Sequence, residues 1–371
     1  MNIHLIANMY PSDAYPSYGV FVQNTEKILQ DAGFTVTKTV MQKKTGKLQK
    51  LIQYGLYYAT VLREGLSGKH DALYVHYAAH NAPPLLLLKK LKPNVKIVTN
   101  VHGSDVVPEV ASQEKFQPYV KKLIRQSEMV LTPSNYYRDL VIEKYQPDTQ
   151  IRIFPSGGVN KGVFYPAPEQ DTAFRKELSL SETARYIGYV GRLDVGKGWE
   201  VFLKSIAHLK EHAPEAIEGV RFLVVGSGKD DEAYEQLVNE LQLQDHIDRF
   251  KLMPQKDLVK VFNIIEAFIF PTKRKGESLG LVGLEAMACG TPIIASRIGG
   301  ILDYTEEGKN GMLFDVGDHQ ALSSHIESFL QMPAKQQADM QQAALGTAAQ
   351  YETSQISHLL VEAFEELQQN K

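Results

Sequence analysis

The sequence predicts an α/β protein made of two doubly wound domains. Short β-rich runs alternate with helical stretches, and a β-α-β rhythm of this kind forms a mostly parallel sheet with helices on both faces. The rhythm stops at residues 163–171, where two prolines and several charges remove any periodicity, and then restarts. The length of 371 residues suits two cores, because a single core stops growing at about 250–300 residues.

Hydrophobic patterning predicts five strands in the first half, at residues 3–7, 34–40, 71–76, 95–103 and 129–134. A helix is predicted over residues 18–33, where it ends at a glycine. Ligands of such sheets bind at the carboxyl ends of the strands. Side chains just past a strand, such as His102 and Asp105, are therefore candidate binding residues.

Four more strands are predicted in the second half, at residues 185–194, 220–228, 267–272 and 291–296. The last stretch, 353–369, has the period of an amphipathic helix and is followed by no strand. We therefore predict Rossmann-like domains over residues 1–165 and 166–350, and a C-terminal helix over residues 351–371.

Composition places the chain among globular proteins, with 43% hydrophobic and 22% charged residues. A single cysteine, Cys289, excludes an internal disulfide framework and favours a reducing compartment. The first residues do not resemble a signal peptide, and the longest apolar run, 83–88, is too short to span a bilayer. These features predict a cytoplasmic protein.

Charge is distributed unequally between the halves. Residues 1–165 contain 20 Lys and Arg against 12 Asp and Glu, a net +8, whereas residues 166–371 carry a net −11. Part of the excess lies in a basic run that precedes an apolar and aromatic stretch, at Lys38, Lys43, Lys44, Lys47 and Lys50. This pattern predicts either an interfacial helix on an anionic membrane surface or an ordinary surface helix with a solvated lysine face.

The stretch 276–300, GESLGLVGLEAMACGTPIIASRIGG, predicts a short buried helix that opens at Gly280 and closes at Gly290. A helix N-terminus with a glycine at its mouth suits a diphosphate, because its first N–H groups are unpaired and its dipole end is positive. Glu285 interrupts the apolar helix, and a buried carboxylate needs partners. Sugar hydroxyls would supply them, unless Glu285 lies on an exposed edge.

Two further glycine-containing segments follow strands. In GRLDVGKG, residues 191–198, the cations Arg192 and Lys197 come directly after an apolar run, where they can approach phosphate oxygens. The GSG turn at Gly226 lacks the third glycine of a dinucleotide fingerprint, since Asp231 stands in its place. On its own this turn is a weak signal.

Together, these segments resemble the retaining GT-B glycosyltransferases of family 4, the glycosyl transferases group 1. The resemblance covers the whole chain and implies two Rossmann-like domains facing across a cleft. In that family the signature glutamates have seven residues between them, as Glu277 and Glu285 do. The resemblance implies that Glu277 contacts the transferred sugar and Glu285 the ribose, while the amides around Gly280, Leu281 and Val282 meet the diphosphate.

Further roles follow from the same resemblance. Arg192 and Lys197 would neutralise the leaving nucleoside diphosphate where charge develops, so no metal or other cofactor is expected. His102 would face the donor sugar, and Asp105 would shape that turn, although a lone histidine is more often structural. Gly19 would let the backbone approach the diphosphate.

The donor's nucleotide is assigned two contacts by the resemblance. Gly226 would lie near the nucleotide, and Met253, between Leu252 and Pro254, would present backbone to the base. The alternative for Met253 is a core methionine that fills a gap.

The expected activity is that of a hexosyltransferase, moving a sugar from a nucleotide diphosphate sugar to a saccharide or lipid-linked acceptor in bacterial surface polysaccharide or glycolipid assembly. No nucleic-acid partner is expected. Three alternatives stay open: a nucleotide-sugar epimerase of similar architecture, a dinucleotide-binding oxidoreductase with an incomplete glycine fingerprint, and a non-catalytic binding module. The last would use the basic half but leave the glutamate block unexplained.

Overall fold

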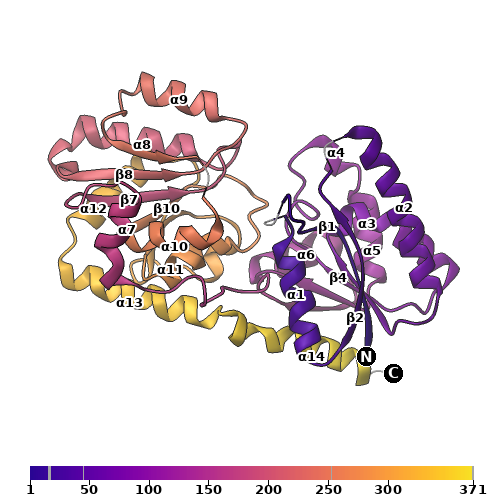
Figure 1. Cartoon of the computed structure of the whole chain (residues 1–371). Helices are drawn as coiled ribbons and strands as arrows, with labels where there is room; N and C mark the ends of the chain where they lie inside the picture. The colour runs from indigo at the N-terminus through magenta and orange to yellow at the C-terminus, as the bar shows by residue number, and fades with distance from the viewer. Residues whose placement is uncertain (16–17, 45, 252, 370–371) are drawn as a thin grey trace. The chain divides into compact units, whose positions relative to one another are not determined.

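The computed structural model describes residues 1–15, 18–44, 46–251 and 253–369, and its internal contacts divide the chain into two compact units. The first unit is Met1–Gly157 with Ile356–Lys371, and the second is Gly158–Gln355. Each unit contains one parallel six-stranded sheet with helices on both faces (Figure 1). The α/β fold with two doubly wound sheets, as predicted, is therefore present.

The first sheet has the strand order β2-β1-β3-β4-β5-β6. Its strands are β1 (Asn2–Tyr10), β2 (Thr35–Gln42), β3 (Ala72–His76), β4 (Ile97–Asn100), β5 (Met129–Thr132) and β6 (Gln150–Ile153). Its helices are α1 (Val20–Asp31), α2 (Lys47–Leu66), α3 (Ala78–Leu91), α4 (Ala111–Glu114), α5 (Gln117–Gln126), α6 (Asn135–Tyr145) and α14 (Thr353–Gln369). The order reverses between β1 and β3, which makes their carboxyl ends the switch point of this sheet.

Two hydrophobic cores sandwich the first sheet. Helices α2, α3, α5 and α6 pack on one face, with Val61, Leu85 and Val120 among the fully buried side chains. Helices α1 and α14 pack on the other, where Leu360 and others of the last helix meet the strands. The amphipathic helix predicted at the C-terminus thus completes the core of the N-terminal unit.

The second sheet has the order β12-β11-β10-β7-β8-β9, with its switch point between β7 and β10. Its strands are β7 (Arg185–Val190), β8 (Val220–Val225), β9 (Ile247–Phe250), β10 (Ala267–Phe270), β11 (Ile293–Ser296) and β12 (Gly311–Phe314). Its α-helices are α7 (Asp171–Glu177), α8 (Trp199–His212), α9 (Asp231–Glu240), α10 (Gln255–Ile264), α11 (Leu281–Ala288), α12 (His319–Leu330) and α13 (Ala334–Gln350). Short 3-10 helices are η1 (Pro168–Gln170), η2 (Pro214–Ile217) and η3 (Gly299–Asp303).

The division between the units falls at Gly157 and Gly158, eight residues before the boundary predicted from the two prolines. The reason lies in packing. Val159, Phe164 and Ala167 are buried in one core of the second unit, together with residues of α10, α11 and α13. The segment 158–167 therefore belongs to the second unit, although its sequence resembles a linker.

Candidate active site

The loops that follow β7 and β10 lie side by side at the switch point of the second sheet. The N–H of Lys273 donates to the carbonyl of Gly196 over 2.8 Å, which joins the two loops through their backbones. A Cβ on Gly198 would lie 1.7 Å from the carbonyl oxygen of Pro271. Both loops leave the carboxyl ends of adjacent strands, the position at which ligands of doubly wound sheets bind.

A buried ion pair links these loops. Lys197 Nζ lies 3.0 Å from Glu277 Oε2, and the two side chains are only 17% and 13% exposed. Thr272, directly after β10, also donates to Glu277 Oε2, over 3.2 Å. Burial opposes ionisation of Glu277, but the charges of Lys197 and Arg274 and the two hydrogen bonds outweigh it and lower the carboxyl's pKa. Two predicted residues thus meet although 80 positions separate them.

Arg192 has a different environment. Its guanidinium pairs with Asp194 over 2.7 Å, and its side chain is 65% exposed. The Asp194 carboxylate also accepts the N–H of Lys229, over 3.0 Å, from the loop after β8. The Arg192 side chain is therefore exposed to solvent, whereas the ammonium group of Lys197 is paired with the carboxylate of Glu277.

Helix α11 begins at Gly280, whose φ of 75° lies in the left-handed region that favours glycine. A Cβ there would also lie 2.8 Å from Phe270 Cε1. Leu281 and Val282 form the first turn and pack partly against the core, so their side chains fix the helix end. Their N–H groups belong to the first turn, which has no acceptors within the helix.

Glu285 is half-buried on α11 and has a partner that the sequence did not reveal. Gln255 Nε2, from the start of α10, donates to Glu285 Oε1 over 2.9 Å. Burial raises the pKa of Glu285 to about 7, against the opposing effect of this hydrogen bond. Met253 is half-buried and packs against the hydrophobic core to which α11 contributes. Leu252 lies outside the described residues.

The GSG turn packs on the loop that carries Arg192. A Cβ on Gly226 would lie 1.8 Å from the carbonyl oxygen of Gly191, so no larger residue fits without a backbone shift. The N–H of Leu193 donates to the carbonyl of Ser227, and Ser227 Oγ bonds Asp231. Asp231, which breaks the dinucleotide fingerprint, therefore holds the turn in place.

The predicted residues of the first unit gather at the switch point between β1 and β3. His102, after β4, is buried, and its Nε2 lies 2.9 Å from Nδ1 of His76, at the end of β3. Burial lowers the pKa of His102 to about 3, so its imidazole is neutral at pH 7. Phe21, in the first turn of α1, covers its ring with centroids 4.7 Å apart.

Asp105 and Gly19 shape the backbone of this edge. The buried Asp105 carboxylate accepts three backbone N–H groups, from His102, Gly103 and Ala78, at 2.9–3.1 Å. Gly19 caps α1 with a φ of 81°, and a Cβ there would lie 3.0 Å from the backbone of Met9. Both residues fix loop conformation in the structure.

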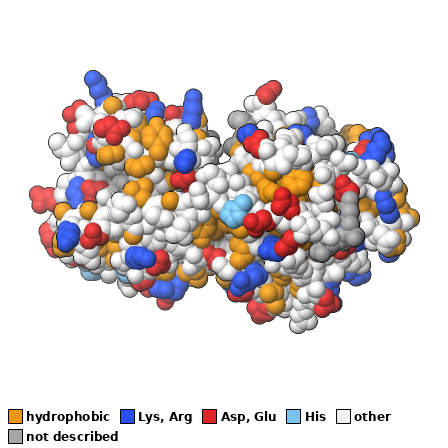
Figure 2. All heavy atoms as spheres, turned by 90° about the horizontal axis from the view of Figure 1, so that it is seen from below, with side chains coloured by type: hydrophobic (Ala, Val, Ile, Leu, Met, Phe, Trp, Pro, Cys, Tyr) orange, Lys and Arg blue, Asp and Glu red, His pale blue; other side chains and the backbone are white. Residues whose placement is uncertain are grey.

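The predicted basic segment separates into two parts. Lys38 is paired, since its Nζ lies 2.9 Å from Tyr10 Oη and from Glu26. Helix α2 then presents an apolar stripe to solvent, with Leu48, Leu51, Ile52 and Leu56 between 56% and 71% exposed. Figure 2 shows one face of the molecule, where hydrophobic side chains lie among charges of both signs. Among the described helices, none is long and apolar enough to cross a membrane.

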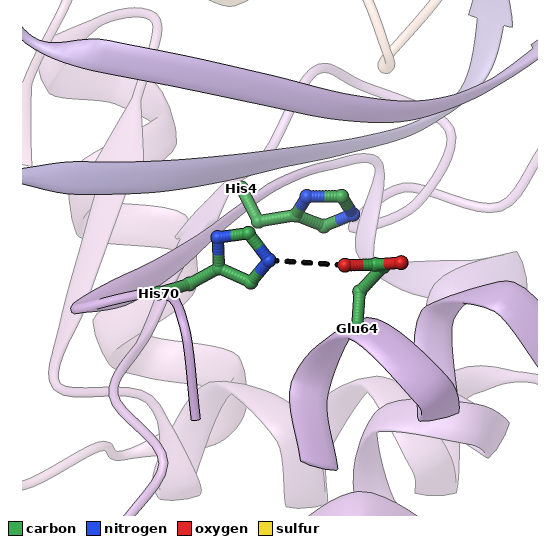
Figure 3. Close-up of side chains that lie close together, drawn as sticks. All are labelled: His4, Glu64 and His70. Atoms are coloured by element: carbon green, nitrogen blue, oxygen red, sulfur yellow. Dashed lines mark hydrogen bonds and ion pairs between the residues drawn. The ribbon is translucent and has the colours of Figure 1, made fainter. Parts of the chain in front are cut away.

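His4, Glu64 and His70 form a further cluster, which the sequence did not single out (Figure 3). His70 Nε2 lies 3.2 Å from Glu64 Oε2. Their ligand atoms are close enough together to hold a metal ion. However, Thr37 and Thr39 hydroxyls occupy the two His4 nitrogens at 2.7 and 2.8 Å. The cluster also lies at the amino ends of β1 and β3, the edge opposite to the candidate site.

The switch point of the second sheet thus combines the Lys197–Glu277 pair with the glycine-capped start of α11, at the edge where doubly wound sheets bind ligands. Comparison with known proteins identifies the family. The family model of Glycosyl transferases group 1 matches residues 170–347, and that of Glycosyltransferase Family 4 matches residues 4–157. The chain belongs to the family 4 glycosyltransferases.

Curated relatives include the D-inositol 3-phosphate glycosyltransferase of Stackebrandtia nassauensis, 24% identical over 80% of this chain and 68% of the relative. The enzyme of the same name from Segniliparus rotundus is 28% identical over 76% of this chain and 63% of its own length. The GDP-mannose-dependent alpha-(1-6)-phosphatidylinositol monomannoside mannosyltransferase of Mycolicibacterium smegmatis is 25% identical, over 77% and 73%.

Solved structures share the fold at lower identity. Sucrose-phosphate synthase from Thermosynechococcus elongatus has a TM-score of 0.81 at 21% identity, with both chains covered completely. Anabaena HepE in complex with UDP-glucose has a TM-score of 0.74 at 16% identity, covering 99% of this chain and 100% of its own. The chain thus has the GT-B fold.

Proposed function

We propose that the protein transfers a hexosyl unit from a nucleotide diphosphate sugar to a saccharide or lipid-linked acceptor, with retention at the anomeric carbon and without a metal ion. The reaction would serve the assembly of a bacterial surface polysaccharide or glycolipid. The observation that carries the proposal is the buried pair of Lys197 and Glu277 at the switch point of the second sheet. The names of relatives and neighbours that use GDP-mannose or bind UDP-glucose support a nucleotide sugar donor.

We assign the donor's diphosphate to Lys197, Arg192 and the N-terminus of α11. Lys197 and the exposed Arg192 follow β7, and the first turn of α11 follows β10, the neighbouring strand. Positive charge at this place stabilises the leaving diphosphate as the glycosidic bond breaks, the role a metal has in other transferases. Glu285, with Gln255 beside it, is assigned to the ribose.

Glu277 is assigned to hydroxyls of the transferred sugar and not to proton removal. Its lowered pKa makes it a weak base, and burial likewise lowers the pKa of His102 and makes it a weak base. We therefore propose that the bond from C1 to the leaving phosphate breaks while the acceptor oxygen bonds C1 on the same face. The acceptor's proton passes to the leaving phosphate oxygen.

The acceptor is assigned to the first unit, and a membrane surface is proposed as its setting. The exposed leucines of α2 form one stripe, and buried Tyr57 and Val61 occupy the opposite side of the helix. Lysines before and within α2 would add attraction to anionic lipids. Replacing Leu48, Leu51 and Leu56 with serine should release the protein from anionic vesicles, and unchanged co-sedimentation would rule this contact out.

Ligand-induced thermal shifts test the donor proposal. UDP, GDP, ADP and their sugars are added in turn, because a ligand at 100 times its dissociation constant stabilises the folded state by about 2.7 kcal/mol. One nucleotide class should give a shift that Lys197→Met abolishes and that Lys309→Met, an exposed lysine of the same unit, leaves unchanged. Chelator should leave transfer unchanged. A lack of response to every nucleotide would contradict the proposal.

A further inference from the structure

A pocket opens at the carboxyl ends of β1 and β2 in the first unit. Its volume is about 330 Å³, and residues from four separate segments line it. These include Asn8, Tyr18, Lys43, Lys44, Lys50 and Tyr54. None of the residues assigned to the donor lines this pocket. It lies instead at the strand end that precedes Gly19.

Three lysines make the pocket cationic. Lys43 Nζ lies 4.4 Å from the ring centroid of Tyr15, which orients this side chain. Among the described residues, no carboxylate forms an ion pair with Lys43, Lys44 or Lys50, whereas Lys38 nearby is neutralised by Glu26. All three side chains are exposed, and a phosphate bound between them would accept charge-assisted hydrogen bonds from their ammonium groups.

The pocket also has an unused acceptor. Asn8 Oδ1 is buried and receives no hydrogen bond from any described residue. An unsatisfied buried acceptor of this kind is costly, and a ligand hydroxyl is the donor that would satisfy it. Tyr18 and Tyr54 also line the pocket. Burial and the neighbouring Tyr54 raise the pKa of Tyr18, so its phenol remains a hydrogen-bond donor at pH 7.

We infer that this pocket binds a phosphorylated polyhydroxy group, with the lysines on the phosphate, Asn8 on a hydroxyl and the tyrosines against the ring. As part of the acceptor, the group would identify the acceptor of the proposed function as a sugar phosphate or polyol phosphate. The same chemistry occurs in a free phosphate ester and in the headgroup of a glycerophospholipid.

Binding to the full-length chain tests the inference by calorimetry with inositol 1-phosphate, inositol and inorganic phosphate as probes. The triple variant Lys43→Met, Lys44→Met, Lys50→Met should lose at least about tenfold in affinity for inositol 1-phosphate, because each lost charge-assisted hydrogen bond is substantial. The matched control is the triple variant Lys69→Met, Lys115→Met, Lys121→Met. It removes the same charge from exposed sites of the first unit and should bind as the wild type does.

Asn8→Ala separates the two halves of the ligand. It should weaken inositol 1-phosphate binding while leaving inorganic phosphate binding unchanged. Vesicles containing phosphatidylinositol, compared with phosphatidylglycerol vesicles of equal charge, distinguish the sources. Preference for phosphatidylinositol with no binding of the soluble phosphate assigns the pocket to a lipid headgroup, and binding of the soluble ester assigns it to a free acceptor.

Equal losses in both triple variants, or no binding of any phosphate probe at millimolar concentration, would overturn the inference. Nucleotide-induced thermal shifts are measured on the same variants. They should be unchanged in all of them, so a failure of the pocket is distinguishable from a failure of the donor site.

Discussion

Replacing Lys197 should destabilise the second unit, because the carboxylate of Glu277 loses its ion-pair partner. The ammonium and carboxylate lie 3.0 Å apart with less than a fifth of either side chain exposed. At an effective dielectric of about 20, their attraction is about 5 kcal/mol. Desolvation cancels much of this in the intact pair, but loss of one partner alone costs about 3–5 kcal/mol. Lys197→Met should therefore lower the free energy of unfolding by about that amount at pH 7.

A double-mutant cycle with Glu277→Gln isolates the interaction. The double variant should be more stable than Lys197→Met alone, because the buried charge is gone, with a coupling energy of about 2 kcal/mol or more. The difference in unfolding free energy between Lys197→Met and the wild type should also depend on pH. Burial without Lys197 raises the pKa of Glu277 above its unfolded value, so the deficit of Lys197→Met should grow as pH rises from 4 to 7.

Urea denaturation followed by tryptophan fluorescence measures these energies. The chain's single tryptophan, Trp199, is buried at the start of α8 and therefore reports on the second unit. The exposed pair of Lys309 and Glu306 provides a control cycle, expected to couple by less than about 1 kcal/mol. Additive effects of Lys197→Met and Glu277→Gln, or a pH-independent deficit, would show that the two side chains are not coupled.

Gly226→Ala should destabilise the second unit by about 1–3 kcal/mol, because its Cβ would collide with the carbonyl of Gly191. Gly346 lies on α13 with open space around it, so Gly346→Ala should stabilise the unit by about 0.5–1 kcal/mol. Equal urea midpoints would contradict this. As pH increases toward 7, the affinity for a nucleotide sugar should rise by up to about tenfold per pH unit, and above pH 7 it should level off. The reason is that ribose hydroxyls favour ionised Glu285. Glu285→Gln should flatten that titration, and a slope retained in the variant would exclude Glu285 as its source. Burial lowers the pKa of His4 to about 4, so the first unit should lose about 3 kcal/mol between pH 6.5 and 4 and none above that range. Tyrosine fluorescence would detect this loss, and His4→Gln should diminish it.

The two doubly wound units and the helices with the strongest hydrophobic patterns could be predicted from the sequence. The buried α11 and the amphipathic α14 follow from hydrophobic period and glycine stops, which are local properties. Strands β6, β9 and β12 escaped prediction. Each lies at the edge of its sheet, where one side has no partner strand, and neither β6 nor β9 has a fully buried residue. β6 and β9 therefore have no continuous hydrophobic run to give a signal.

The contacts between side chains far apart in the sequence depend on the fold. The signature spacing marked Glu277 and Glu285, but their partners Lys197 and Gln255 come from loops and helices 80 and 30 positions away. Only strand order brings such residues together, because β7 and β10 become neighbours through long-range pairing. The same holds for the lysine pocket, whose charges were visible in sequence. Its cavity and the unsatisfied Asn8 arise only when β1, β2 and α2 pack together.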